Sequence, residues 1–176
     1  MSPRVLIAAP SSQVFADNAE ILDEMVTDET VSRFVELIRG AGREARFVEF
    51  LIVLCQCNGK AVRPNQWRVC KLLLQEAPEL LFRLQLRSRE DSIGLGGVKQ
   101  EGGTDVFISG DPRYFPAFRD EGEMELSRWL DVTAPTNVTY FEHSMELIAL
   151  LVRGRNLKNV VAVQKMLPYE LVEVRI

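Results

Sequence analysis

The chain has 176 residues, 47% of them hydrophobic, which is enough to bury one substantial core and too apolar for a disordered protein. Its formal net charge of −4 argues against general nucleic-acid binding, and its three cysteines argue for a reducing compartment over a disulfide-stapled secreted domain. No apolar run approaches the roughly 20 residues that a membrane-spanning helix needs.

The opening stretch Met1–Pro10 superficially resembles a signal peptide. Its apolar core lies between two prolines and is shorter than the about 7–15 residues typical of such peptides. We therefore expect a strand or a broken first element there. Ser11 or Ser12 then caps a helix that starts near Gln13.

A second helix is predicted to begin after Thr27 or Asp28, either of which can cap it. Gly40 and Gly42 are expected to end it. Its apolar residues recur at the spacing of one helical face, as Val31, Phe34, Val35 and Ile38.

The next helix, from about Arg43 to Cys57, is apolar on more than one side and is therefore predicted to be central and fully buried. Cys57-Asn58-Gly59 is interpreted as its C-terminal cap, because Asn and Gly accept left-handed backbone angles. The two apolar faces comprise Phe47, Phe50, Leu51 and Leu54 on one side and Val48, Ile52 and Cys55 on the other.

A fourth helix is expected to fold back against this central one, so that the two form a hairpin. Pro64 suits its first turn, or Asn65 caps it, and it runs to about Glu76. Its inward residues are predicted to be Trp67, Cys70, Leu73 and Leu74.

The pattern changes after Pro78. Alternating apolar residues in Leu80–Arg87 predict a strand, and Val106–Ser109 predicts a second strand that pairs with it. The glycine-rich stretch Ser88–Thr104 between them is expected to be a mobile loop. Asp111–Pro116 is predicted to form a turn, and Met124–Leu130 a short helix that carries Trp129.

Helical periodicity returns after Pro135, with Thr136 or Asn137 as the cap and Gly154 as the end of a long helix. Its apolar stripe is predicted as Val138, Phe141, Met145, Ile148 and Val152, broadened by Leu147 and Leu151. Asn156 is expected to cap a further helix, Leu157–Leu167, with Val160, Val161, Val163 and Met166 inward. Pro168 can begin a last helix that runs to Ile176.

These elements predict a mainly α, armadillo-like solenoid or bundle with a small β-hairpin or loop excursion in the middle. We expect one domain over residues 1–176, with helical halves at 11–77 and 135–176 and the excursion at 78–134. The end within an apolar Leu171-Val172 element suggests a piece of something longer.

The string LCQCNGKAVRPNQWRVCKLLL resembles a segment of ryanodine and inositol trisphosphate receptors, within their shared cytosolic RIH domain. The inositol trisphosphate receptor branch is favoured because the resemblance continues, in order, from about Ser12 to Val172. The positions that match ryanodine receptors are Leu54, Cys55, Cys57-Asn58-Gly59, Ala61-Val62-Arg63 and Asn65-Gln66. The further pieces similar to inositol trisphosphate receptors are Thr30–Gly40, Arg46–Leu51, Val106–Asp120 and Tyr140–Asn156.

The resemblance implies a non-enzymatic connector in a tetrameric, ligand-gated calcium-release channel, which transmits ligand-driven movement towards the pore. Its partners would be other domains and subunits of that channel, at the cytoplasmic face of the endoplasmic reticulum or a related calcium store. The segment itself would be soluble and contact neither membrane nor nucleic acid. The alternative is a free-standing armadillo-like protein-interaction scaffold. The arginines, lysines and tyrosine that grip the ligand in those receptors have no counterpart here, so no ligand-binding residue is transferred.

Each group of side chains that could carry chemistry also has a plausible structural role. Cys55, Cys57 and Cys70 with His143 could in principle hold zinc, but buried structural cysteines and a helix-surface histidine are favoured. Cys57, near a helix end, is the most reactive candidate. A lone histidine without a serine or cysteine motif does not support a catalytic triad.

Four other patterns also favour a structural interpretation. The glycines of 94–97 and 102–103 lack the Lys-Ser/Thr of a phosphate loop, and the Asn137-Val138-Thr139 sequon is interpreted as a helix start. The acidic run Asp120–Glu125 lacks a calcium-binding ladder. Carbonyl capping and ion pairing are favoured over phosphate binding for the basic cluster Arg33, Arg39, Arg43 and Arg46. The sequence therefore predicts no catalytic, ligand-binding or metal site and no cofactor.

Overall fold

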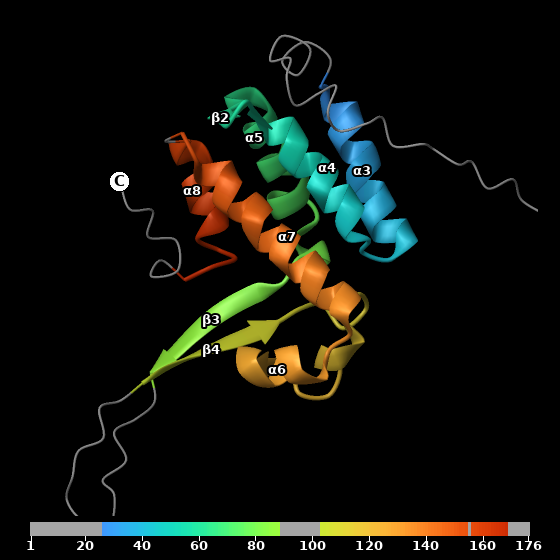
Figure 1. The fold of residues 1–176 in the computed structure, drawn as a ribbon, viewed down its shortest axis with the longest axis vertical. Helices are drawn as coiled ribbons and strands as arrows, with labels where there is room; N and C mark the ends of the chain where they lie inside the picture. The colour runs from blue at the N-terminus through green and yellow to red at the C-terminus, as the bar shows by residue number, and fades with distance from the viewer. Residues whose placement is uncertain (1–25, 89–102, 155, 169–176) are drawn as a thin grey trace, which may run out of the picture.

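The computed structural model describes residues 26–88, 103–154 and 156–168. Among them it is mostly helical, with six α-helices and two small antiparallel sheets (Figure 1). The predicted elements at Met1–Pro10, from Gln13 and from Pro168, and the interior of the glycine-rich loop, lie outside the described residues.

Helix α3, Asp28–Ala41, confirms the second predicted helix and its cap. The Thr27 hydroxyl accepts a hydrogen bond from the Thr30 amide at 3.2 Å. Gly42, with a left-handed φ of 85°, ends the helix, whereas Gly40 lies within it. Val31, Val35 and Ile38 are buried, as their spacing predicted.

Helix α4, Ala45–Cys55, packs between α3 and α7 (Figure 1). The prediction that this helix is fully buried is wrong. Arg46 and Glu49 are exposed, and Phe47 and Phe50 are half-buried. The Phe50 ring stacks on Phe34 of α3 with ring centroids 3.9 Å apart. The buried side of the helix is made by Val48, Leu51, Ile52, Leu54 and Cys55.

The cap predicted at Asn58-Gly59 is instead a β-hairpin turn between β1, Gln56–Cys57, and β2, Lys60–Ala61. The left-handed angles were predicted correctly, since φ is 50° at Asn58 and 73° at Gly59. Two consecutive left-handed residues are what a type I′ hairpin turn requires, and Asn-Gly is its preferred sequence. The carbonyl of Cys55 accepts the Val62 amide at 2.9 Å, which closes the hairpin where the helix ends.

Helix α5, Arg63–Val69, continues without a break into the π-helical segment η1, Cys70–Gln75. Pro64 lies in its first turn, as predicted, whereas Asn65 is not a cap. The inward position of Trp67 was predicted wrongly, since it is 43% exposed. The fully buried Asn65 and Gln66 occupy the inward side of that turn, so Trp67 points outward. The predicted inward residues Cys70, Leu73 and Leu74 are buried.

The excursion forms a three-stranded sheet that follows the short 3₁₀ turn η2, Pro78–Leu80. Strand β3, Arg83–Ser88, pairs antiparallel with β4, Thr104–Ser109, which confirms the predicted pairing, and Ser88 and Thr104 are strand ends and not loop. A third strand, β5 (Glu123–Glu125), pairs with β4. It occupies the start of the predicted Met124–Leu130 helix, so that helix begins later than predicted. Helix α6, Leu126–Val132, begins only after that strand and carries the buried Trp129.

An aromatic cluster around Phe82 holds the excursion on the N-terminal half of α7. The ring centroid of Phe82 lies 4.0 Å from that of Phe115, which precedes the 3₁₀ turn η3, Pro116–Phe118. It also lies between 5.1 and 6.3 Å from the rings of Trp129, Phe141, Tyr140 and Phe118. Edge-to-face contacts of this kind favour a defined orientation of each ring.

Helix α7, Pro135–Val152, starts at its proline and not after Thr136 or Asn137. Pro135 fits the first position of a helix because its missing amide has no intrahelical acceptor there. Ile148 and Val152 of the predicted stripe are buried, whereas Val138, Phe141 and Met145 are half-buried. The buried side of the helix includes Tyr140, Ser144, Leu147 and Leu151.

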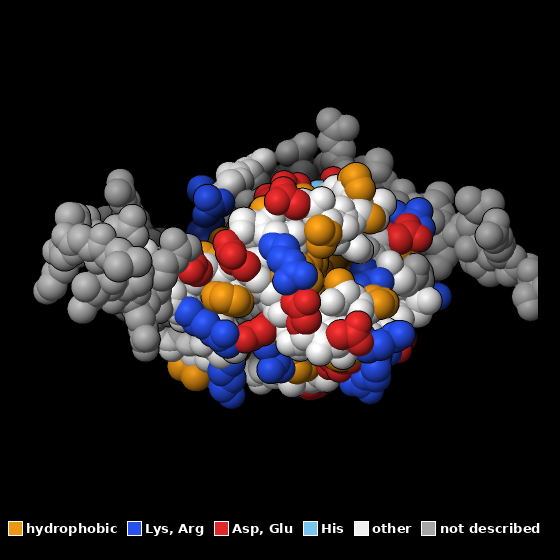
Figure 2. Space-filling view, turned by 90° about the horizontal axis from the view of Figure 1, so that it is seen from below, with side chains coloured by type: hydrophobic (Ala, Val, Ile, Leu, Met, Phe, Trp, Pro, Cys, Tyr) orange, Lys and Arg blue, Asp and Glu red, His pale blue; other side chains and the backbone are white. Residues whose placement is uncertain are grey.

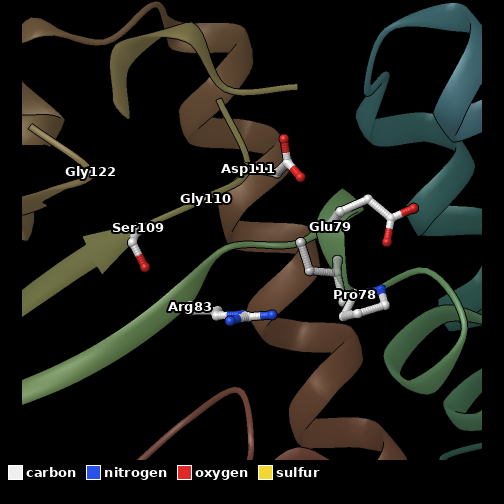
Figure 3. A pocket seen from close by; sticks show the side chains of 8 residues that line it. Pro78, Glu79, Arg83, Ser109, Gly110, Asp111 and Gly122 are labelled. Carbon is white, nitrogen blue, oxygen red and sulfur yellow. The ribbon is translucent and has the colours of Figure 1, made fainter. Parts of the chain in front are cut away.

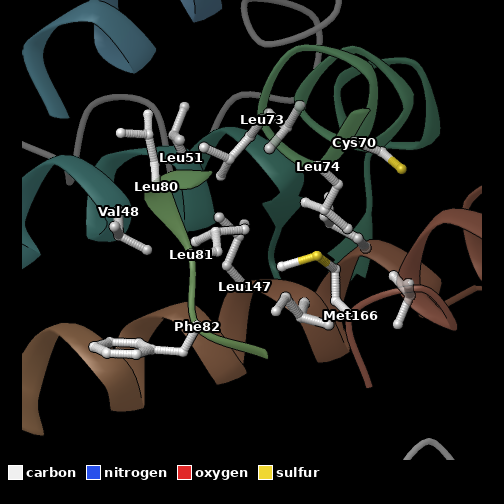
Figure 4. Close-up of a cluster of buried hydrophobic side chains, with 14 of the residues drawn as sticks. Val48, Leu51, Cys70, Leu73, Leu74, Leu80, Leu81, Phe82, Leu147 and Met166 are labelled. Atoms are coloured by element: carbon white, nitrogen blue, oxygen red, sulfur yellow. The ribbon is translucent and has the colours of Figure 1, made fainter. Parts of the chain in front are cut away.

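Helix α8, Leu157–Val163, is shorter than predicted. Val161 was predicted inward but is 62% exposed, and Leu157 is 76% exposed. Val163 and Met166 are buried, as predicted. Figure 4 shows that the core joins α4, η1, η2, α7 and the segment after α8, through Val48, Leu51, Leu73, Leu74, Leu80, Leu81, Leu147 and Met166.

Candidate functional site

The Asn65-Gln66 pair, which belongs to the string carrying the family resemblance, lies where α4, α5 and α7 meet. Both residues are fully buried. The Asn65 side-chain amide donates to the Leu54 carbonyl at 2.9 Å, and that of Gln66 donates to the Leu150 carbonyl at 2.8 Å. Leu54 and Leu150 lie in the last turns of α4 and α7, where main-chain carbonyls lack the usual i+4 partner, and the Leu150 carbonyl also accepts the Arg153 amide at 3.1 Å. The first turn of α5 is thus tied to the ends of two neighbouring helices.

Three more side chains extend this network towards α8. Asn156 donates to the Gln66 side-chain oxygen at 3.3 Å, and Asn159 donates to the Leu151 carbonyl at 2.8 Å. The Arg63 guanidinium donates to the Gly154 carbonyl at 2.8 Å. We call the five side chains the carbonyl junction: Arg63, Asn65, Gln66, Asn156 and Asn159.

The β1–β2 hairpin packs against the same junction. Gly154 has a left-handed φ of 73°, and a Cβ atom at that position would lie 3.0 Å from the Cβ of Ala61. Glycine is therefore needed at 154 both for its backbone angle and for the close approach of the hairpin. Nearly all the positions from Asn58 to Gln66 that match ryanodine receptors thus have a structural role at this corner of the molecule.

The side chains of the carbonyl junction hold neighbouring helices together through hydrogen bonds. Its members are neutral amides and one guanidinium, which offer neither a nucleophile nor a general base. Four of them donate to main-chain carbonyls and Asn156 donates to the Gln66 side chain. Buried polar groups paired in this way fix the relative positions of the elements that they join. The sequence pattern pointed to these residues through the resemblance, but their partners are 84 and 91 positions away along the chain and could not be identified from it.

The three cysteines are thiols rather than disulfides, and all three are buried. Burial raises the pKa of the Cys70 thiol to about 11 and holds that of Cys55 well above its usual range. Both thiols are therefore protonated at neutral pH and poorly nucleophilic. Cys57 is only 5% exposed, which argues against its predicted reactivity.

The histidine proposed as a companion for these cysteines lies on α7. His143 is half-buried, and its Nδ1 is 2.8 Å from the Thr139 carbonyl one turn earlier. Among residues 26–88, 103–154 and 156–168, no three His, Cys, Asp or Glu side chains are grouped so as to hold a metal ion.

The predicted basic cluster does not converge on one point. Arg39 forms an ion pair with Glu79 at 3.0 Å, and Arg46 pairs with Glu44 at 2.6 Å. The Arg43 guanidinium lies 4.8 Å from the centre of the Phe115 ring, and burial lowers its pKa. Arg39 and Arg43 thus join the α3–α4 corner to the excursion, whereas Arg46 pairs within that corner, and the two ion pairs agree with the ion pairing favoured from the sequence.

The other two weighed patterns lie on the surface and at a helix start. In the acidic run, Glu121 pairs with Arg128 at 3.1 Å and Glu123 pairs with Arg87. The sequon lies in the first turn of α7, and the Thr139 hydroxyl donates to the Pro135 carbonyl at 3.1 Å. Both arrangements agree with the structural interpretations.

A pocket of about 230 Å³ lies between η2 and the ends of β3 and β4 (Figure 3). The sequence did not predict it, because its walls come from three separate segments. Its polar lining comes mainly from Glu79, Arg83, Ser109 and Asp111. A smaller pocket of about 160 Å³ lies beside Gln56 and Arg153.

The surface seen in Figure 2 intersperses acidic and basic side chains with small, separate apolar patches. It shows no broad field of one charge that would mark a general nucleic-acid interface. None of the helices that the structure describes has the length and apolar character needed to span a membrane.

Comparison with known proteins found one matching domain model and similar stretches in two receptor proteins. Residues 11–86 match the model of the RIH domain. The inositol 1,4,5-trisphosphate receptor-like protein A of Dictyostelium discoideum is 27% identical over 145 residues, which cover 79% of this chain and 4% of that protein. The inositol 1,4,5-trisphosphate receptor itr-1 of Caenorhabditis elegans is 33% identical over 69 residues, which cover 39% of this chain and 2% of that protein. The chain thus spans only a small part of the length of the curated relatives that it matches.

Proposed function

Because residues 11–86 of this chain belong to the RIH domain family of inositol trisphosphate and ryanodine receptors, we propose that the chain is a regulatory connector of an intracellular calcium-release channel. In this role it transmits ligand-driven movement towards the pore and carries out no chemistry. Its partners are other domains and subunits of a tetrameric channel. The channel lies in the endoplasmic reticulum or a related calcium-store membrane, with this segment on the cytoplasmic face.

The observation that carries the proposal is the carbonyl junction. A connector must move as one body, because a displacement applied at one side is lost if its helices slide past each other. The buried bonds of Asn65, Gln66 and Asn159 tie α5 and α8 to the ends of α4 and α7. Leaving one such buried group without its partner costs about 1–3 kcal/mol, so the packed arrangement resists shear.

We further propose that the helices are one part of an armadillo-like array and that residues 1–176 form a single domain. Two features support this. Both helical halves contribute to one core, from Leu51 on α4 to Leu147 on α7. Leu157 and Val161, one turn apart on α8, are exposed in a way that suits packing against a further helix.

The same exposed residues support the alternative, a free-standing scaffold that docks another protein on α8. The size of the native polypeptide separates the two functions. An antibody raised against residues 28–88 should detect, in cells that produce this sequence, a polypeptide many times larger than 20.0 kDa that sediments with membranes. Cross-linking of those membranes should give a species four times that size.

A band near 20.0 kDa in the supernatant would overturn the connector function and favour the scaffold. Pre-absorption of the antibody with the purified chain is the control, since it should remove any specific band.

A further inference from the structure

The pocket between η2 and the ends of β3 and β4 has an uneven distribution of charge. The two carboxylates that line it are already paired, Glu79 with Arg39 at 3.0 Å and Asp111 with Arg113 at 2.7 Å. Hydrogen bonds from Arg113 hold the pKa of Asp111 below its usual value, so this carboxylate is charged and engaged.

Arg83 is the third charged side chain of the pocket, and it is not in an ion pair with any described residue. It lines the pocket from the first position of β3 and is exposed. In the part of the chain that the structure describes, no acidic side chain lies within ion-pair distance of its guanidinium. Glu123, on the same sheet, is paired with Arg87. Within residues 26–88, 103–154 and 156–168, the Arg83 guanidinium therefore forms no direct ion pair, and its charge acts at longer range by helping to lower the pKa of Asp111.

Ser109 provides a second donor beside it. Arg83 and Ser109 are directly opposite each other in the antiparallel pair β3–β4, so their side chains stand on the same face of the sheet. Both residues line the pocket, and Figure 3 shows the Arg83 guanidinium extending towards Pro78 while the Ser109 side chain lies farther from Pro78 and Glu79. The site thus presents a planar guanidinium and a hydroxyl to one small volume.

The wall of the pocket that carries Ser109 is held in place by packing. The next residue, Gly110, lies so close to the Phe115 ring that a Cβ atom there would be 2.5 Å from the ring's Cδ2. Phe115 in turn is held between Phe82 and the Arg43 guanidinium. The donors are therefore positioned by the same aromatic cluster that joins the excursion to the helices.

We propose that this site, the Arg83 pocket, binds the carboxylate side chain of an Asp or Glu from a neighbouring domain or subunit. Arginine and a carboxylate form two parallel charge-assisted hydrogen bonds, and one unpaired arginine balances one carboxylate. A phosphate dianion fits less well, because the Glu79 and Asp111 carboxylates flank the site and repel the second charge. The volume of about 230 Å³ is below the roughly 300–1,000 Å³ of typical small-molecule sites and suits a single inserted side chain.

The proposal deepens the connector function, since it gives the chemistry of one partner contact at the joint between helices and sheet. The test is a titration of the full ¹⁵N-labelled chain, followed by two-dimensional NMR that includes the arginine side-chain Nε–H signals. The probes are N-acetylglutamate amide, its neutral analogue N-acetylglutamine amide, and inorganic phosphate. We expect the glutamate probe to shift the signals of Arg83, Ser109 and Gly110 saturably, with a Kd on the order of 1 mM, which corresponds to about −4.1 kcal/mol.

Three variants make the assignment specific. Arg83→Gln should weaken binding of the glutamate probe by at least about tenfold, which corresponds to about 1.4 kcal/mol. Arg83→Lys should cause an intermediate loss of affinity, because lysine keeps the charge but cannot form the two parallel hydrogen bonds. Arg119→Gln is the matched control, since it removes the same charge from an exposed position outside the pocket and should leave binding unchanged.

Several outcomes would overturn the proposal: no saturable shift at Arg83, equal shifts with the neutral analogue, or an equal loss in Arg83→Gln and Arg119→Gln. Binding of phosphate as tightly as the glutamate probe would assign the pocket to phosphate instead. Because the titration uses the chain alone, its failure would leave the connector function to be decided by the size and sedimentation of the native polypeptide.

Discussion

At the scale of single residues, Gln66 makes two hydrogen bonds within the carbonyl junction. Its side-chain amide donates to the Leu150 carbonyl, and its side-chain oxygen accepts from Asn156. Gln66→Leu keeps much of the volume and removes both of these hydrogen bonds, while the Leu150 carbonyl still accepts the Arg153 amide. The free energy of unfolding in urea should fall by about 1–3 kcal/mol. Gln85→Leu, on the exposed face of β3, is the control and should stay within about 0.5 kcal/mol of the parent protein. Equal effects of the two changes would show that the junction adds no stability.

Two glycines should respond to alanine with opposite signs. Gly59 has a φ of 73° and Gly40 lies inside α3, and a Cβ atom would meet nothing within 4 Å at either position. Gly59→Ala should therefore destabilise by about 1 kcal/mol through backbone strain alone. Gly40→Ala should stabilise by about 0.5–1 kcal/mol through helix propensity. Thermal melts of both variants check this, and a loss of stability in Gly40→Ala would contradict it.

Cys70 predicts a dependence of stability on alkaline pH. Its pKa is raised by burial from 9.0 to about 11 in the folded chain, so the unfolded chain loses the thiol proton first as pH rises. The contribution of this thiol to stability is thus fully present below about pH 9 and is lost as the pH rises through about 11. Urea midpoints between these pH values should fall, and less steeply in Cys70→Ala. An unchanged slope in that variant would show that Cys70 does not contribute.

At the scale of secondary-structure elements, the buried side of α4 is defined by Leu51 more than by Phe50. Leu51 is fully buried, whereas Phe50 is half-buried and stacked on Phe34. Leu51→Ala should cost about 2–5 kcal/mol, from lost burial and the cavity that it leaves. Phe50→Ala should cost less than Leu51→Ala, because the Phe50 side chain is only half-buried. Urea melts that rank the two variants in the reverse order would show that α4 packs chiefly through its aromatic side.

The helices were predictable wherever a local signal decided the structure. Thr27 capped α3, the i, i+3, i+4, i+7 repeat of Val31 to Ile38 marked its buried side, and the alternation in Leu80–Arg87 marked β3. These signals act within a few residues of each other, so the sequence contains them in full.

Errors arose where distant partners decided the structure. Trp67 was predicted inward on grounds of hydrophobicity, but the inward side of that turn is taken by Asn65 and Gln66, whose acceptors lie on α4 and α7. Asn58-Gly59 suits both a helix cap and a hairpin turn, and the β1–β2 pairing with the hydrogen bond from Val62 to Cys55 distinguishes the two. The pocket beside Arg83 was missed for the same reason, because its walls meet only in the folded chain.

At the scale of the whole molecule, the junction connects stability to the proposed role in the channel. In a full-length channel that contains this segment, Gln66→Leu should reduce calcium release from store membranes at saturating ligand, because the helices on either side can then shift independently. Binding of ligand to the channel should be unchanged, because the sequence predicts no ligand-binding residue in this chain. Gln85→Leu is again the control. Normal release by Gln66→Leu would argue against transmission through this junction.

The long connection between Gln66 and Leu150 also governs how the chain can fold as it is made. The two residues are 84 positions apart, and ribosomes add roughly 5–20 residues per second, so Gln66 leaves the ribosome about 4–17 s before its acceptor. Throughout that interval the apolar side of α4 has no α7 to cover it, and non-local contacts of this kind slow folding. The nascent chain is therefore exposed to aggregation until α7 emerges, and it should depend on chaperones that bind apolar segments during synthesis.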